Sequence, residues 1–118
     1  MKTVSKVLTG VLAAEFLSLG TAKFAAVASM RERAAHLGYS TTAYRGIGAV
    51  ELLAASGVLA GLVRPAIGRA AGTGLVLLMT GAVASHLRNG DGTTEIAPAA
   101  GTALIAAAYV ATLTGGPR

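Results

Sequence analysis

The chain has 118 residues, enough for a single domain over 1–118, and 53% of them are hydrophobic while only 13% are charged. A soluble domain carries about 25% charged residues, so this composition predicts an integral membrane protein. Because Cys is absent, disulfides, Cys-ligated metal centres and thiol redox chemistry are excluded within this chain. The net charge of +5 is scattered over loops and helix ends, which indicates contact with lipid headgroups and no binding of nucleic acid.

Four apolar stretches approach the roughly 20 residues that a helix needs to cross a bilayer. They cover 4–28, 46–63, 66–87 and 94–113. Arg64-Pro65 and Asn89-Gly90-Asp91-Gly92 predict tight turns between the later stretches. The expected fold is all-α, a bundle of four transmembrane helices in a multi-pass protein of the cell membrane, with both termini on one side.

The first stretch begins like a signal peptide, with Lys2 and Lys6 before an apolar run and a cleavage-like Ala26-Val27-Ala28. However, Glu15 and Lys23 interrupt what should be an uncharged core. We therefore expect this stretch to be retained as a span.

The segment 30–44 (MRERAAHLGYSTTAY) is too polar to span and too long for a hairpin turn. Its part 31–37 predicts a short interfacial helix closed by Gly38. Tyr39 and Tyr44 fit the aromatic belt where lipid headgroups meet hydrocarbon.

The distribution of Lys and Arg does not fix the orientation, because each side carries five of them. The terminal side holds Lys2, Lys6, Arg64, Arg69 and Arg118, and the other side holds Lys23, Arg31, Arg33, Arg45 and Arg88. If Lys23 and Arg45 lie inside the bundle, the remaining charges favour termini in the cytoplasm.

Small residues predict where the helices approach one another, since lipid supplies no hydrophobic drive between them. The pairs Gly57/Gly61 and Gly68/Gly72 have the required spacing, and the last stretch has a ridge at Ala99, Ala103, Ala107 and Ala111. We expect these ridges to pack the bundle and to favour association with another membrane subunit or with a second copy.

Ionisable residues inside the spans are the strongest functional signal, because each costs at least ~2.5–3.5 kcal/mol at membrane depth. Glu15 and Lys23 are eight residues apart, about 12 Å along a helix, so they cannot pair directly. Glu51 lies early in the second stretch and His86 near the end of the third.

Antiparallel packing would bring Lys23, Arg45 and Glu51 to one depth, with His86 at the same end. Glu15 would lie deeper, with Ser18 on its face as a hydrogen-bond partner. The alternative is that Lys23 and Arg45 reach out to the headgroups and that His86 caps a helix.

Four segments follow one another along the chain: FLSLGTAKF (16–24), LGY (37–39), RGIGAVELL (45–53) and GAVASH (81–86). Their order and spacing resemble the DoxX-like family of small four-helix membrane proteins. The resemblance covers almost the whole chain. It implies a polar site at Lys23, Glu51 and His86 and a link to membrane redox complexes, since the family is named for a subunit associated with thiosulfate:quinone oxidoreduction.

We therefore expect a small subunit of a membrane oxidoreductase. Glu51, Lys23 and His86 would exchange protons with a quinone or another lipophilic ligand, and Glu15, Arg45 and Tyr39 would help bind it. No intrinsic cofactor and no metal are expected, so a partner subunit would store the electrons.

Two alternatives stay open. One is redox-neutral acid/base chemistry on a lipophilic metabolite or peptide, such as isomerisation, epimerisation or epoxide opening, with Glu51 and either Lys23 or His86 as base and acid. The other is a non-catalytic assembly partner.

Overall fold

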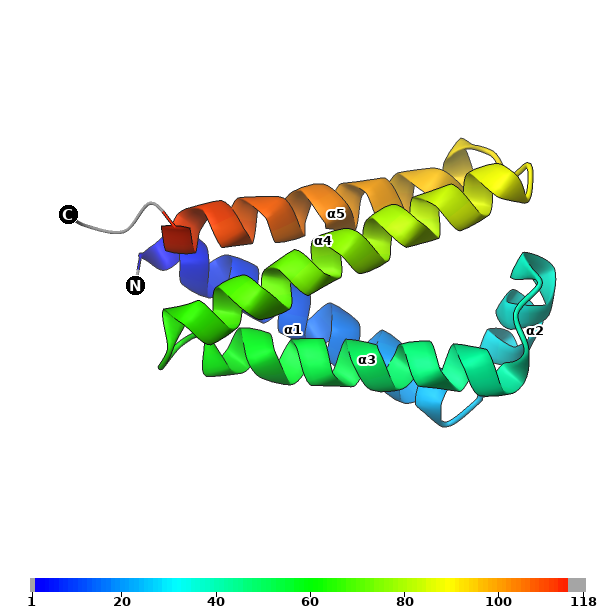
Figure 1. Ribbon diagram of the computed structural model, residues 1–118, viewed down its shortest axis with the longest axis horizontal. Coiled ribbons are helices and arrows are strands. Elements are labelled where there is room, and N and C mark those ends of the chain that lie inside the picture. Colours follow the sequence, from blue (N-terminus) through cyan, green and yellow to red (C-terminus); the bar gives the residue numbers. More distant parts are fainter. Residues whose placement is uncertain (1, 115–118) are drawn as a thin grey trace.

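The computed structural model describes residues 2–114, and within this range the chain forms five helices (Figure 1). They are α1 (Thr3–Phe24), α2 (Ala28–Leu37), α3 (Thr41–Ala60), α4 (Pro65–Arg88) and α5 (Thr93–Thr114). All except α2 are long and apolar enough to cross a membrane. The predicted all-α bundle of four spans, with a short helix between the first two, is confirmed.

The third helix begins five residues before the predicted second span, at Thr41. Its start is set by Ser40, whose hydroxyl oxygen accepts a hydrogen bond from the backbone N–H of Ala43 at 3.0 Å. Tyr44 and Arg45 therefore lie within the helix, although the predicted span begins only after them.

The short helix α2 is set off from its neighbours by two residues with left-handed backbone. Ala26 has φ of 54° and ends the turn that follows α1, so α1 stops at Phe24, before the predicted end of the first span. Gly38 has φ of 82° and closes α2, as its sequence predicts. Hence α2 turns away from α1 and lies across one end of the bundle (Figure 1).

The start of α1 and the end of α5 lie at the same end of the bundle, as an even number of spans predicts (Figure 1). The opposite end carries α2 and the turn between α4 and α5. Helix α1 packs along α3, and α4 packs along α5. The two pairs cross near the terminal end and diverge toward α2.

The crossing is built on the glycines that the sequence singled out. A Cβ atom on Gly57 would lie 2.7 Å from the Cβ of Ala71, and one on Gly61 would lie 2.8 Å from the Cα of Gly68. The ring of Tyr109 fills the remaining space and donates a hydrogen bond from its hydroxyl to the carbonyl of Val58 at 3.2 Å. These contacts confirm that both glycine pairs serve helix packing.

The predicted packing ridge on α5 is confirmed only for Ala103, which is half-buried and packs against the core. Ala107 and Ala111 are exposed, and the buried face consists of Thr102, Ala106, Tyr109 and Leu113. The ring of Tyr109 determines which face of α5 is buried, because it packs where Gly68 and Gly72 of α4 leave room for it. With Tyr109 on the inner face, Ala107 and Ala111 lie on the outer face.

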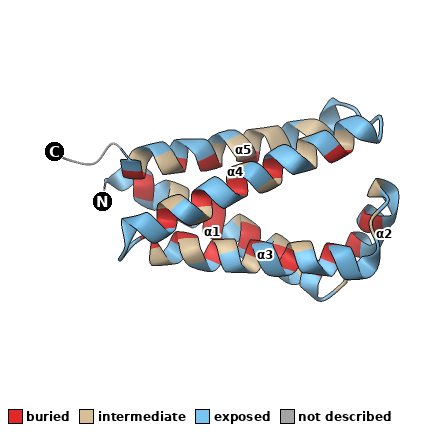
Figure 2. Cartoon of the chain, viewed as in Figure 1, coloured by how far each residue is buried: buried red, intermediate tan, exposed pale blue. Residues whose placement is uncertain are grey.

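Much of each long helix is exposed (Figure 2), and many of the exposed residues are large and apolar. Leu53, Leu77 and Leu104 are 73%, 69% and 72% exposed, respectively. Such a surface would be costly in water and suits lipid hydrocarbon, so the fold is that of a multi-pass membrane protein.

Contact between α1 and α3 depends on a second pair of glycines, Gly20 and Gly48. A Cβ atom on Gly48 would lie 2.7 Å from the backbone nitrogen of Phe24 and 2.8 Å from the carbonyl oxygen of Gly20. Because these are backbone atoms, no side-chain adjustment can make room.

We therefore expect Gly48→Ala to lower the free energy of unfolding by about 1–3 kcal/mol, the usual cost of overpacking. The matched control is Gly46→Ala in the same helix, where an added Cβ meets nothing within 4 Å. Reversible unfolding in mixed micelles measures both. Equal stability of the two variants would contradict close α1–α3 contact at Gly48.

Candidate functional site

The centre of the site is an ion pair inside the bundle between Lys23 of α1 and Glu51 of α3. The Nζ of Lys23 donates to both carboxylate oxygens of Glu51, at 2.8 and 3.1 Å. Lys23 is 7% exposed and Glu51 is fully buried. The prediction that Lys23 approaches Glu51 is confirmed.

The close contact of Gly20 and Gly48 positions the Lys23–Glu51 pair. Gly20 precedes Lys23 by three residues, and Gly48 precedes Glu51 by three, so each glycine shares a helix face with its charged neighbour. Close contact of the backbones at Gly20 and Gly48 brings the side chains within hydrogen-bond distance. The ring of Tyr44 covers the ammonium group, with its centroid 5.3 Å from Nζ, in a cation–π contact.

The ion pair faces a cavity of about 800 Å³ between the two diverging helix pairs. Apolar groups from three helices form much of its wall, among them Leu19, Ile47, Leu77, Leu78 and Ala82. Polar groups gather toward α2, where Arg33, His36, Tyr39, Ser85 and His86 line it. The cavity is therefore amphipathic, with a polar end near α2.

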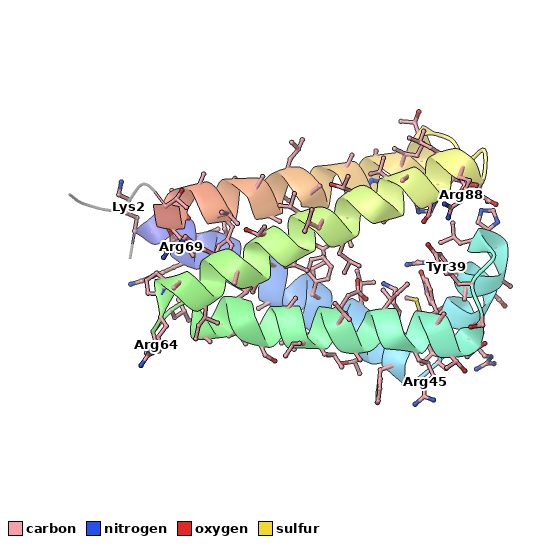
Figure 3. The ribbon with its side chains drawn as sticks, viewed as in Figure 1. Lys2, Tyr39, Arg45, Arg64, Arg69 and Arg88 are labelled. Atoms are coloured by element: carbon pink, nitrogen blue, oxygen red, sulfur yellow. The ribbon has the colours of Figure 1, made fainter. Side chains whose placement is uncertain are left out.

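Five of the six predicted site residues line this cavity: Glu15, Lys23, Tyr39, Glu51 and His86. Lys23 and Glu51 form the wall on the α1–α3 side, and His86 belongs to α4 across the cavity. Tyr39 reaches inward from the segment after α2 (Figure 3), and its hydroxyl lies 2.7 Å from the hydroxyl of Ser85.

Glu15 lies deeper than the ion pair, as predicted, but its partner differs from the expected one. Its carboxylate accepts a hydrogen bond from the hydroxyl of Thr102 in α5 at 2.8 Å. Ser18, the partner expected from helix spacing, is exposed on the outer face of α1. The contact to Thr102 joins α1 to α5 below the polar end.

Arg45 does not belong to the cavity, and its inclusion in the interior cluster is wrong. The side chain is exposed and points away from the bundle (Figure 3). Its Nε donates to the carbonyl of Phe24 at 2.8 Å, and its guanidinium lies 5.0 Å from the centre of the Phe24 ring. Arg45 thus satisfies a free carbonyl at the end of α1.

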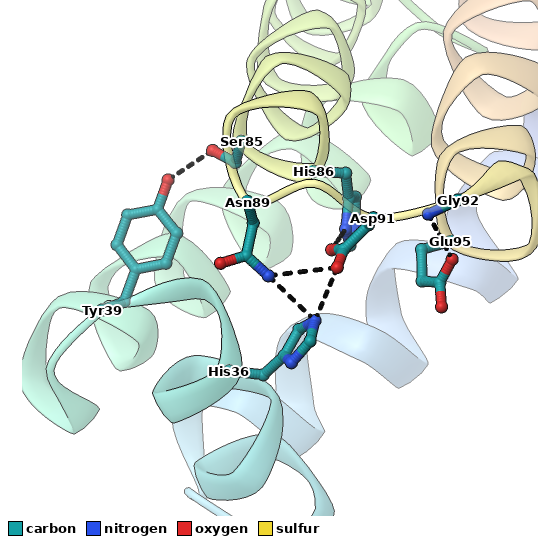
Figure 4. A network of polar contacts seen from close by, with 8 residues as sticks. All are labelled: His36, Tyr39, Ser85, His86, Asn89, Asp91, Gly92 and Glu95. Carbon is teal, nitrogen blue, oxygen red and sulfur yellow. Dashed lines mark hydrogen bonds and ion pairs between the residues drawn. The ribbon is translucent and has the colours of Figure 1, made fainter.

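A second polar network, which sequence reasoning missed, joins α2 to the turn between α4 and α5 (Figure 4). The carboxylate of Asp91 lies 2.6 Å from Nδ1 of His86 and 2.9 Å from Nε2 of His36, and it accepts from the amide of Asn89 at 3.0 Å. The sequence marked 89–92 only as a turn. The five-residue spacing of His86 and Asp91 was a local signal, whereas nothing in the sequence pointed to His36.

These contacts hold the pKa of the Asp91 carboxyl at about 2, below its ordinary value of 3.8. The hydrogen bond to His86 is the largest cause, followed among the lowering contacts by that to His36. Asp91 is therefore a carboxylate at any physiological pH. Among the described residues, no group of three His, Asp or Glu side chains is arranged to hold a metal ion.

The fold and site define a class: four-span membrane bundles with a buried ion pair facing an amphipathic cavity. Residues 7–108 match the DoxX-like family, so the chain belongs to that family. Comparisons with curated proteins and with solved structures gave no match. Membership supports the fold, and the chemistry of the site rests on its geometry.

Removing one member of the ion pair should be more damaging than removing both. Lys23→Met or Glu51→Met alone leaves a buried charge without its partner, which costs about 3–5 kcal/mol in comparable cases. The double variant replaces the pair by apolar groups of similar volume and should recover most of this loss. Unfolding in mixed micelles measures the cycle, and additive losses would contradict a direct interaction.

The titration of Asp91 tests the second network. Since the folded-state pKa is lowered, the contribution of these contacts to stability is present above pH 3.8 and is lost as the pH falls toward about 2. We expect the ¹³Cγ resonance of Asp91 to titrate near 2 in micelles and to move toward 3.8 in His86→Ala. An ordinary titration in the unaltered protein would contradict the network.

Proposed function

We propose that this chain is the small membrane subunit of a membrane-associated oxidoreductase, and that its cavity binds the headgroup of a quinone or a similar lipophilic molecule. The observation that carries the proposal is the Lys23–Glu51 pair, kept at membrane depth with one side toward a cavity of about 800 Å³. An ion pair serving only stability would gain little from such a cavity, because burial of charge is costly and apolar packing would hold the helices as well.

The size and lining of the cavity fit a quinone headgroup. Pockets for small molecules commonly have about 300–1,000 Å³, mostly apolar walls and a few polar groups that orient the ligand. Lys23 has three N–H donors, of which two bind Glu51, so one remains for a ligand oxygen. The hydroxyls of Tyr39 and Ser85 bind each other, so one of their two O–H groups remains as a donor for a ligand.

The charges of the lining favour a neutral ligand over an anionic one. Four of the five acidic residues in the chain line the cavity: Glu15, Glu32, Glu51 and Glu95. Among the nine Lys and Arg residues that the structure describes, two do so, Lys23 and Arg33. Fatty-acid and phospholipid anions would be repelled by this excess, whereas a quinone carries no charge.

A path for such a ligand leads from the lipid. Leu77 lies near the middle of α4, lines the cavity and is 69% exposed on the outer surface. We infer that the cavity opens toward the lipid beside Leu77. A long isoprenoid or alkyl tail would stay in the bilayer while its headgroup occupies the polar end.

A bound quinone would supply the electron chemistry, and this chain would supply orientation and protons. Lys23 would hold one quinone oxygen through an N–H of Nζ, and Glu51 would keep Nζ in place through both carboxylate oxygens. A proton leaving Nζ could be replaced from the polar end of the cavity, where His86 lies. Because the sequence has no Cys, a partner subunit would deliver or remove the electrons.

Acid/base chemistry without redox is the second candidate, and one observation favours it. Lys23 and Glu51 lie on the α1–α3 side of the cavity, and His86 lines it from α4. A substrate between them would meet an acid and a base on opposite faces, as isomerisation or epimerisation requires. Exchange of a substrate C–H for deuterium from D₂O, without an electron acceptor, would distinguish this candidate.

The proposal predicts binding of a decyl-substituted benzoquinone to the purified protein in nanodiscs. Lys23→Met/Glu51→Met, which keeps the volume of the pair, should lose at least about tenfold in affinity, the order expected for one charge-assisted hydrogen bond. Arg45→Met is the matched control, because it removes a cation outside the cavity and should bind normally.

Absence of quinone binding in the unaltered protein would contradict the proposal, as would equal affinity of the double variant. If a membrane partner still co-purifies in that case, the chain is an assembly subunit. Equilibrium dialysis of the labelled quinone measures all three proteins.

A further inference from the structure

We infer that α2 and Tyr39 form a lid over the polar end of the cavity, latched to α4 and its following turn by two sets of hydrogen bonds. This lid is the segment 28–39, and the latch consists of the His36–Asp91 and Tyr39–Ser85 contacts. The inference concerns access to the cavity from the aqueous face and so rests on the proposed function for its biological role. Its structural basis is independent of the ligand.

The lid covers the cavity directly. Helix α2 contributes Ser29, Glu32, Arg33, His36 and Leu37 to the lining. One side of the helix is anchored, since Met30 and Ala34 are buried against Tyr44 of α3. The opposite side meets α4 and its turn across the polar end of the cavity (Figure 4).

The attachment of the lid differs on its two sides. Toward α1 and α3 it is held by apolar packing and by the chain itself. Toward α4 and α5, the hydrogen bonds among described residues come from only two lid side chains, His36 and Tyr39. His36 is exposed to solvent, with 55% of its side chain accessible, so water competes for its contact with Asp91. The latch is therefore the side that opens.

Two backbone positions allow such movement as hinges. Ala26, with φ of 54°, lies just before the lid, and Gly38, with φ of 82°, lies near its end. Left-handed backbone at Ala26 is unfavourable for a residue with a Cβ atom, so this turn has a lower-energy alternative when the latch is released. Gly38 moves freely between these regions.

Asp91 is built to hold the latch closed. Its carboxylate contacts the imidazole of His86, which precedes it on the same side of the cavity, and the imidazole of His36 on the lid. The side-chain amide nitrogen of Asn89 lies 3.1 Å from Nε2 of His36. His86 and Asn89 fix the carboxylate before the lid arrives. Closing the lid then orders the side chains of His36 and Tyr39, while the carboxylate is already in place, which limits the entropic cost.

The absence of Cys in the sequence allows a direct test. Leu78→Cys places one thiol on α4 in the cavity lining, in a half-buried position about two helical turns before Ser85. A charged, membrane-impermeant methanethiosulfonate reagent reaches this thiol from water through the polar end, so it will react faster when the lid is open. The rate of modification in nanodiscs therefore measures opening without any assumption about the ligand.

His36→Ala in this background should raise the rate on the order of two- to tenfold, as expected when one or two hydrogen bonds that hold a closed state are lost. His36→Gln, whose amide can still donate to Asp91, should restore a slow rate. Tyr39→Phe tests the second half of the latch and should raise the rate as well. Arg88→Gln removes a charge at the same end of the bundle but outside the cavity lining, so it controls for loss of charge and should leave the rate unchanged.

Equal modification rates in the protein with an unaltered latch, in His36→Ala and in Tyr39→Phe would overturn the inference of a lid. So would a rate in His36→Gln as fast as in His36→Ala, because then the hydrogen bond is not what closes the cavity. The quinone-binding measurement reports separately on the proposed function. The modification rates can therefore confirm the lid even if no quinone binds. Quinone binding can likewise be confirmed even if the rates show no lid.

Discussion

The burial of one ion pair at membrane depth is the interaction on which the rest of the structure depends. Lys23 and Glu51 can be tolerated there only if each neutralises the other, and this requires α1 and α3 to touch. The glycines at positions 20 and 48 make that contact possible. Once α1 and α3 are joined in this way at their α2 end, α4 and α5 cannot pack equally closely against them there.

The divergence of the two helix pairs follows from where each pair finds its small residues. Gly57, Gly61, Gly68 and Gly72 bring α3, α4 and α5 together near the terminal end, around Tyr109. At the other end α1 and α3 use their glycines for each other. The space left between the pairs becomes the cavity, and polar contacts from α2 close it where apolar packing is missing.

The same arrangement gives the cavity its two chemical ends. Toward the bundle centre, leucine and alanine side chains form apolar walls, and one of them, Leu77, is also exposed on the outer surface. Toward α2, hydroxyl, imidazole and carboxylate groups form the polar end. A ligand with an apolar tail and a polar head would find both of its parts accommodated, which is why a lipophilic headgroup is the proposed occupant.

The membrane class, the helices and one ion pair could be predicted from the sequence alone, because composition and local spacing are properties of the chain itself. The scarcity of charge required a membrane, four apolar stretches gave four helices, and Gly38 marked the end of α2. The approach of Lys23 to Glu51 also followed, since a buried charge in lipid has few possible partners.

Only the tertiary structure decided which way each helix faces. Arg45 lies one residue after Tyr44, yet one side chain is exposed and the other buried, and a rotation that sequence spacing does not fix makes the difference. The same applies to α5, where Tyr109 sets the buried face. The contact of His36 with Asp91 joins residues 55 apart and exists because α2 folds across the end of the bundle, which depends on packing between helices and on no local signal.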